Sequence, residues 1–238
     1  MNKHLLGLIQ LIRRALRGHG PLIALLLLGV GAPWFIFVEV AEDIWESGGF
    51  IGDQSILEWI HHLEAPTLDT VALAFTTAGG PEVMSLLGLA LVGLLYWKRC
   101  RHEALFFALA VCGAVALNVL AKTLFGRPRP ALWESIAPAK FYSFPSGHAM
   151  GSAALAAALG FLLWQSPWRW PVCILGTLFT LGVGLSRMYL GVHYPSDVLA
   201  GWVCSLGWVA GLHVLLSPDF QQLQTWWREG VAYWNRSV

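Results

Sequence analysis

The sequence predicts an all-α membrane protein with six transmembrane helices. Of its 238 residues, 56% are hydrophobic and 12% are charged, whereas a water-soluble domain carries about a quarter charged residues. Several long stretches contain no Asp, Glu, Lys or Arg, and each is about long enough to cross ~30 Å of hydrocarbon as a helix. These stretches are 18–38, 104–121, 149–168, 170–186 and 198–218. The composition excludes a disordered chain, and a net charge of +1 excludes the strongly basic surface that nucleic acid requires.

The uncharged stretches predict the positions of the six spans, and the chain is predicted to form one domain. We expect spans near residues 21–40, 81–97, 103–124, 148–165, 169–186 and 197–216. Gly79-Gly80-Pro81 should end one helix and start another, so 67–78 is predicted to be an interfacial or re-entrant piece. Because no repeat, linker or low-complexity segment interrupts the sequence, residues 1–238 are predicted to form a single domain.

The distribution of charge predicts the orientation. Lys and Arg precede the first span and lie between the second and third, at Lys3, Arg13, Arg14, Arg17, Lys98, Arg99 and Arg101. By the positive-inside rule these segments are cytoplasmic, which assigns 1–20 to that side. An even number of spans then places the tail 217–238 on the same side. Eight acidic residues lie from Glu39 to Asp69, with no Lys or Arg among them. We therefore expect 41–80 to be an external loop, with a short surface helix near 53–64.

Polar residues gather on the predicted external face. Three segments supply them: 122–130 after the third span, 145–148 at the start of the fourth, and 186–197 between the fifth and sixth. Lys122 and Arg187 lie at the ends of otherwise uncharged spans, where ionisable residues are costly and usually functional. Several cations with few carboxylates nearby indicate a dense anion, and a phosphate fits best. The acidic segment 39–69 would repel such an anion, so we expect it to lie outside the phosphate site.

Two histidines in these segments suit nucleophilic chemistry on phosphorus. A neutral imidazole can attack phosphorus when its other nitrogen is held by an acceptor. The i,i+4 spacing of His193 and Asp197 allows that pairing if the chain is helical there. His148 can protonate the leaving oxygen and later activate water. Just before it, Ser146 is a natural N-cap, and Gly147 allows a ligand to approach the backbone of a helix N-terminus.

Three spaced motifs give the chain a family resemblance. Lys122-x6-Arg129-Pro130, Pro145-Ser146-Gly147-His148 and Ser186-Arg187-x5-His193-x3-Asp197 resemble the three-part signature of the type 2 phosphatidic acid phosphatase superfamily. The resemblance runs from about residue 70 to 216. It implies a six-helix membrane core and metal-independent hydrolysis through a phosphohistidine intermediate, with no cofactor.

The resemblance also assigns roles to individual residues. It implies that His193 is the nucleophile, Asp197 its orienting partner and His148 the acid and base. The phosphate ligands that it implies are Lys122, Arg129, Ser146, Gly147 and Arg187. Arg127 stays outside this set because the x6 spacing selects Arg129. Lys140 also stays outside it, since both residues could equally sense headgroups or only flank the site. A metal held by His148, His193 and Asp197 is disfavoured by the neighbouring cations, which would repel a divalent ion.

The expected substrate is a membrane lipid phosphate or diphosphate, hydrolysed at the outer surface of a bacterial plasma membrane. We rank undecaprenyl diphosphate first, since an outward-facing site suits recycling of that carrier during wall synthesis. Phosphatidylglycerophosphate, phosphatidate and lipid A phosphates are alternatives, with the 131–143 loop and the groove between spans as the expected selectors. A lipid phosphotransferase, or a transporter or scaffold that binds lipid phosphates without chemistry, is the other possibility. The only expected partners are the substrate and the bilayer, with no nucleic acid and no obligatory protein.

Overall fold

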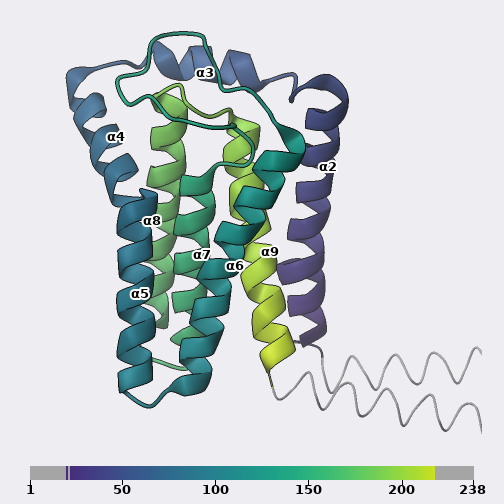
Figure 1. The fold of residues 1–238 in the computed structure, drawn as a ribbon, viewed down its shortest axis with the longest axis vertical. Helices are drawn as coiled ribbons and strands as arrows, with labels where there is room; N and C mark the ends of the chain where they lie inside the picture. Colours follow the sequence, from purple (N-terminus) through teal and green to yellow (C-terminus); the bar gives the residue numbers. More distant parts are fainter. Residues whose placement is uncertain (1–19, 21, 218–238) are drawn as a thin grey trace, which may run out of the picture.

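A computed structural model describes residue 20 and residues 22–217. The segments expected to be cytoplasmic, 1–20 and 217–238, lie almost entirely outside these described residues. Helices account for all of the regular structure in the described part, and most of them run along one common axis (Figure 1). They are η1 (Leu25–Gly31), α2 (Ala32–Ser47), α3 (Asp53–His61), α4 (Pro66–Ala78), α5 (Pro81–Trp97), α6 (Arg101–Phe125), α7 (Gly147–Leu162), α8 (Arg169–Tyr189) and α9 (Pro195–Leu216).

Each predicted span coincides with a helix, but the helices differ in how well they suit a full crossing. Four are long and apolar enough: Leu22–Ser47, α6, α8 and α9. The pair α4 and α5 would make a fifth span, bent by 44° at its break. Helix α7 has 16 residues, or about 24 Å of length, which is short for a span. By length and composition the described residues therefore support four or five crossings, fewer than the predicted six.

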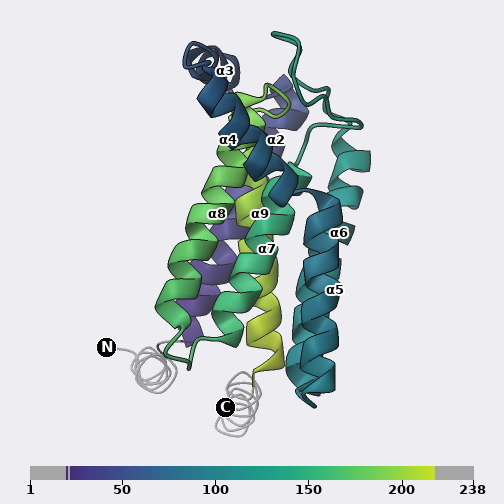
Figure 2. The same ribbon diagram turned by 90° about the vertical axis from the view of Figure 1, so that its left-hand side faces the viewer.

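Proline and glycine set several of the helix boundaries. Pro66, Pro81 and Pro195 each occupy the first turn of their helix, where a missing N–H costs nothing and the fixed φ suits the helix. Helix α6 ends at Gly126, whose φ of +57° is left-handed and therefore favours glycine. The predicted break at residues 79–81 is the bend between α4 and α5, and it turns α4 away from the bundle axis (Figure 2).

The core of the bundle is built from small side chains. Helix α7 packs against α6, α8 and α9. Four of the ten buried residues in this core cluster are alanines, Ala110, Ala114, Ala154 and Ala158, and Phe107 and Val209 are buried beside them. Small residues let helix backbones approach closely in a bilayer, where packing replaces the hydrophobic effect between helices. The apolar body therefore gives the helix ends fixed relative positions.

One end of the bundle holds all three predicted polar segments. The loop 126–146, the start of α7 and the turn between α8 and α9 meet there, and α3 lies across the same end (Figure 1). Helix α3 is the short surface helix expected near 53–64, and it belongs to the acidic segment. Hence the acidic segment and the cationic segments share one end of the molecule.

Candidate active site

The predicted catalytic residues come from separate helix ends. His148 is in the first turn of α7, His193 in the turn before α9, and Asp197 in the first turn of α9. The His148 imidazole lies within electrostatic range of His193, Lys122, Arg129 and Arg187. The structure therefore brings residues from all three motifs into one cluster.

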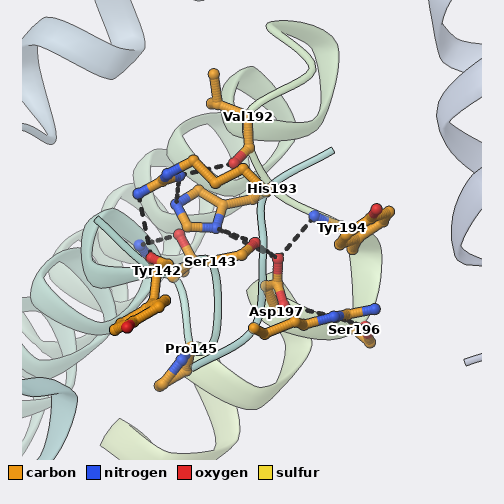
Figure 3. Close-up of polar contacts among 12 residues, drawn as sticks. Tyr142, Ser143, Pro145, Val192, His193, Tyr194, Ser196 and Asp197 are labelled. Atoms are coloured by element: carbon orange, nitrogen blue, oxygen red, sulfur yellow. Dashed lines mark hydrogen bonds and ion pairs between the residues drawn. The ribbon is translucent and has the colours of Figure 1, made fainter. Parts of the chain in front are cut away.

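The His193 ring is buried and held at both nitrogens. It is 1% exposed, with Nδ1 3.4 Å from Asp197 Oδ2 and Nε2 3.0 Å from Arg129 Nη1 (Figure 3). A carboxylate accepts and a guanidinium donates, so the proton belongs on Nδ1 and the lone pair on Nε2. Burial lowers the pKa of His193 to about 3, against the raising effect of Asp197 and with help from Arg129 and Arg187. The ring is thus neutral at physiological pH, with Nε2 unprotonated.

Asp197 is fully buried and fixed by several donors. Its Oδ2 accepts hydrogen bonds from the Tyr194 backbone N–H at 2.8 Å and from the Ser143 hydroxyl. Tyr194 and Asp197 form a capping box at the start of α9, which satisfies backbone N–H groups there. The predicted pairing with His193 is present, although His193 precedes the helix that begins at Pro195. Ser143 was not predicted, and no motif in the sequence signals it.

Arg127, left outside the predicted set, is bonded directly to Asp197. Its Nη1 lies 2.6 Å from Asp197 Oδ1 and its Nη2 lies 2.7 Å from Asp53 Oδ2. All three side chains are buried. Asp53 belongs to the acidic segment that we expected to lie apart from the site. Its charge is instead paired with Arg127, next to Asp197, so this one carboxylate of the acidic segment is part of the buried network.

Arg129 lies beside His193, but its donors are in use. Besides His193, Nη1 donates to the Val192 carbonyl at 2.7 Å, and Nε donates to the Phe141 carbonyl at 2.9 Å. Nη2 donates to the carbonyls of Lys140 and Tyr142, at 2.8 Å and 3.3 Å. Four main-chain oxygens, three of them from the loop 126–146, thus occupy the guanidinium. A phosphate could bind it only by replacing some of them.

The other two predicted cations have donors to spare. Lys122 Nζ donates to the Tyr142 carbonyl, its one hydrogen-bond partner among the described residues. Arg187 is 3% exposed and donates from Nη1 to the Thr76 hydroxyl. Its Nε is buried and has no partner in the described part of the chain. A buried donor without a partner is costly, so Arg187 is well suited to receive an anion.

The start of α7 has the N-cap that the sequence predicted. Ser146 is the N-cap, and its hydroxyl accepts from the Ala149 N–H at 3.5 Å. Gly147 has a neighbour that the sequence did not indicate, because a Cβ there would lie 3.1 Å from Asn118 Oδ1. Asn118 also donates to the Pro145 carbonyl at 3.0 Å, and so holds this turn against α6. The His148 ring is half-buried and makes no hydrogen bond with a described residue.

Comparison with known sequences gives one family. The model of the PAP2 superfamily matches residues 103–221, which include all three motifs. The chain is 34% identical over 128 residues to the undecaprenyl-diphosphatase of Sulfolobus acidocaldarius, a match that covers 51% of this chain and 58% of that protein. It is 27% identical over 179 residues to phosphatidylglycerophosphatase B of Bacillus subtilis, covering 73% and 87%.

Comparison of structures points the same way. The fold is similar to the crystal structure of a transmembrane PAP2-type phosphatidylglycerolphosphate phosphatase from Bacillus subtilis, with a TM-score of 0.69 and 25% identity. That match covers 76% of this chain and 92% of the solved one. Sequence motifs, fold and site geometry therefore agree, and the chain belongs to the PAP2 superfamily, whose phosphatases hydrolyse phosphate esters and diphosphates.

Proposed function

We propose that this protein hydrolyses a membrane lipid phosphate or diphosphate through a phosphohistidine intermediate formed on His193. One observation carries the proposal: a buried, neutral imidazole presents an unprotonated Nε2 within a group of cations. Such a nitrogen is a nucleophile. The surrounding cations suit the charge on a transferring phosphoryl group.

The residues divide the reaction into two steps. In the first, His193 Nε2 attacks phosphorus, and Asp197 stabilises the positive charge that develops on the ring. The bond from phosphorus to the lipid oxygen breaks, and His148 gives that oxygen a proton. In the second step the now neutral His148 takes a proton from water, the water oxygen attacks the phosphohistidine, and inorganic phosphate leaves.

Phosphate binding in this scheme requires one local change. Arg129 donates to His193 Nε2, so the incoming phosphate must draw the guanidinium onto its own oxygens. Arg187 and Lys122 have donors available without such a change. We infer that all three cations contact the phosphoryl group, and that the N–H groups of 147–149 at the start of α7 complete its ligands.

We propose undecaprenyl diphosphate as the substrate, with undecaprenyl phosphate and inorganic phosphate as products. The names of the Sulfolobus acidocaldarius relative and of the undecaprenyl-diphosphatase BcrC of Bacillus subtilis support this choice. Two other Bacillus subtilis matches, one of sequence and one of structure, are named for phosphatidylglycerophosphate. Both lipids present a terminal phosphate that reaches the same cations. Phosphatidylglycerophosphate, phosphatidate and lipid A phosphates are therefore the matched competitors.

We propose a six-span topology in one domain, with both termini cytoplasmic and the site external. Helix α7 and the bent pair α4–α5 would supply the two further crossings. Lys98, Arg99 and Arg101 lie at the end of the bundle opposite the site, which supports a cytoplasmic assignment for that end. Labelling of single cysteines at Ser47 and Lys98 by a membrane-impermeant maleimide, in a variant lacking the native cysteines, tests this. Labelling of Ser47→Cys alone in intact cells is expected.

Phosphate release by the purified protein tests the function. The assay compares the four lipids in detergent with EDTA present, and includes His193→Ala as the blank. Release that survives EDTA and disappears in His193→Ala is expected, with the highest kcat/KM for undecaprenyl diphosphate. Activity that persists in His193→Ala would refute the mechanism. Release only in the absence of an added lipid or sugar acceptor would identify a phosphotransferase instead.

A further inference from the structure

A buried chain of charges connects the acidic external segment to the nucleophile. It runs from Asp53 in α3 through Arg127 and Asp197 to His193 (Figure 3 shows its inner end). We propose that Arg127, held in place by Asp53, is a positioning residue that keeps Asp197 aligned on His193. This inference rests on the proposed function, since it deepens the role of the same site.

The contacts of Asp197 show what Arg127 contributes. Oδ2 faces His193 Nδ1 and also accepts from Ser143 and Tyr194. Oδ1 has Arg127 as its one hydrogen-bond partner among the described residues. Because a carboxylate can rotate about its terminal bond, fixing Oδ1 also fixes the direction of Oδ2. Removing Arg127 would leave a buried oxygen unpaired and the carboxylate free to turn away from the ring.

Arg127 is itself held from four directions. It donates to Asp53 Oδ2 at 2.7 Å, to the Ser196 hydroxyl at 2.8 Å and to the Gly48 carbonyl at 3.1 Å. The guanidinium carbon lies 4.1 Å from the centre of the Tyr194 ring. These contacts require the planar guanidinium with its several N–H donors, and a lysine ammonium group cannot reproduce them. The guanidinium therefore has one available position.

The charge of Asp53 separates Arg127 from the phosphate-binding cations. Arg127 lies between two buried carboxylates, which together exceed its charge. A buried cation compensated in this way has little attraction left for a substrate phosphate. Asp53 also accepts from the Ser196 N–H at 3.0 Å and from its hydroxyl at 2.5 Å, which fastens α3 to the first turn of α9. The acidic segment thus supports the orienting carboxylate without facing the anion.

A positioning role and a merely structural role predict different results. If Arg127 only fastened α3 to α9, its replacement would lower the melting temperature and leave the kcat of the folded protein unchanged. A residue that aligns Asp197 affects the bond-making ability of His193 while phosphate binding to the cations persists. Orthovanadate and inorganic phosphate separate these effects. Vanadium accepts a fifth bond from an imidazole nitrogen, whereas phosphate binds through its oxygens alone.

The experiment compares Arg127→Met, Arg127→Lys and Asp53→Asn with the wild-type protein. Asp43→Asn, an exposed acid in the same segment, and Arg101→Met, an exposed arginine at the opposite end, are the matched controls. For each protein we would measure kcat and KM on the lipid substrate, the Kd of orthovanadate and of phosphate, and the melting temperature.

For Arg127→Met we expect kcat to fall on the order of 100-fold, the loss typical of a slightly misplaced reacting group, with KM little changed. Orthovanadate should bind at least about 10-fold more weakly and phosphate nearly as before, since a displaced nucleophile affects only the covalent ligand. Arg127→Lys should recover part of kcat, and Asp53→Asn should fall between wild type and Arg127→Met. Both controls should match wild type.

Two results would overturn the positioning role. One is an unchanged kcat in folded Arg127→Met and Asp53→Asn with only a lower melting temperature. The other is an equal weakening of vanadate and phosphate binding. Failure of the proposed function has a different signature, because wild type would then release no phosphate from any lipid. The vanadate and phosphate affinities would still test the alignment of His193 in that case.

Discussion

The two histidines of the site lie in opposite surroundings. His193 is buried, with a hydrogen-bond partner at each ring nitrogen, and the partner on its Nδ1 side is held by three further groups. His148 is half-buried and its ring has no hydrogen-bond partner in the described chain. A nucleophile needs a fixed direction and a fixed tautomer, whereas a group that exchanges protons with a leaving oxygen and with water needs access. The difference matches the two roles that we propose.

The largest expected effect comes from changing Asp197, the carboxylate that holds His193, and it tests the difference between the two histidines most strongly. Asp197→Asn keeps the shape of the side chain but cannot act as an anionic acceptor, so the ring can adopt the wrong tautomer. We expect kcat to fall by about 10⁴-fold, as for the equivalent change in other orienting carboxylates. Steady-state phosphate release measures this, with Asp43→Asn as the isosteric control. A loss below about 10-fold would mean that Asp197 does not set the state of the ring.

Disrupting the other histidine should produce a smaller loss that depends on the leaving group. His148→Ala removes the proton donor, and we expect lipid hydrolysis to fall about 10²- to 10⁴-fold. A substrate such as p-nitrophenyl phosphate has an acidic leaving alcohol that needs little protonation. Its first step should therefore be affected much less, which a burst measurement would show. Equal losses on both substrates would contradict an acid role for His148.

The buried state of His193 should also appear in the stability of the protein. Its pKa is about 3 in the folded chain and about 6.5 when unfolded. As the pH falls below about 6.5, His193 binds a proton in the unfolded state but not in the folded state. The free energy of unfolding therefore decreases by up to about 1.4 kcal/mol per pH unit. Above pH 6.5 this group has no effect.

His193→Gln removes that contribution while the other histidines remain. Melting curves of wild type and variant between pH 7.5 and 4.5 measure the difference. We expect the wild type to lose melting temperature more steeply than the variant as pH falls. Parallel curves would show that the ring is protonated in the folded protein.

The smallest expected effect concerns the loop that covers Arg129. Phe141 has a left-handed φ of +64°, its side chain is exposed, and its carbonyl accepts from Arg129. This conformation costs a non-glycine residue roughly 1 kcal/mol. Phe141→Gly should therefore be more stable than Phe141→Ala, which loses the ring but keeps the strain. The two melting temperatures, compared with each other, measure the effect, and a lower value for the glycine variant would contradict it.

The sequence predicted the helices and the convergence of three motifs because both depend on local patterns. Uncharged stretches mark α6, α8 and α9, and the Gly79-Gly80-Pro81 break marks the bend before α5. The number of crossings was less predictable, because the uncharged stretch 149–168 is longer than α7. Helix length depends on where the chain turns, which the charge pattern does not record.

The contacts that hold His193 and Asp197 in place could not be predicted, because they join segments far apart in sequence. The x6 spacing distinguishes Arg129 from Arg127 as a motif position. It does not reveal that Asp53 lies beside Arg127, or that Ser143 donates to Asp197. In the same way, a sequence shows that Arg129 is a cation, but not that main-chain carbonyls occupy its donors.

The shortness of α7 has a consequence for where the reaction takes place. A helix of about 24 Å is roughly 6 Å shorter than the hydrocarbon layer. If its C-terminal end lies at the inner boundary, Ser146 and His148 lie below the outer one. The bilayer beside α7 must then thin, or headgroups and water must descend to meet the helix end. A lipid could therefore present its phosphate to the protein without rising out of the bilayer. Local thinning would bring the hydrocarbon–water boundary to the level of the phosphate ester bond that is cleaved.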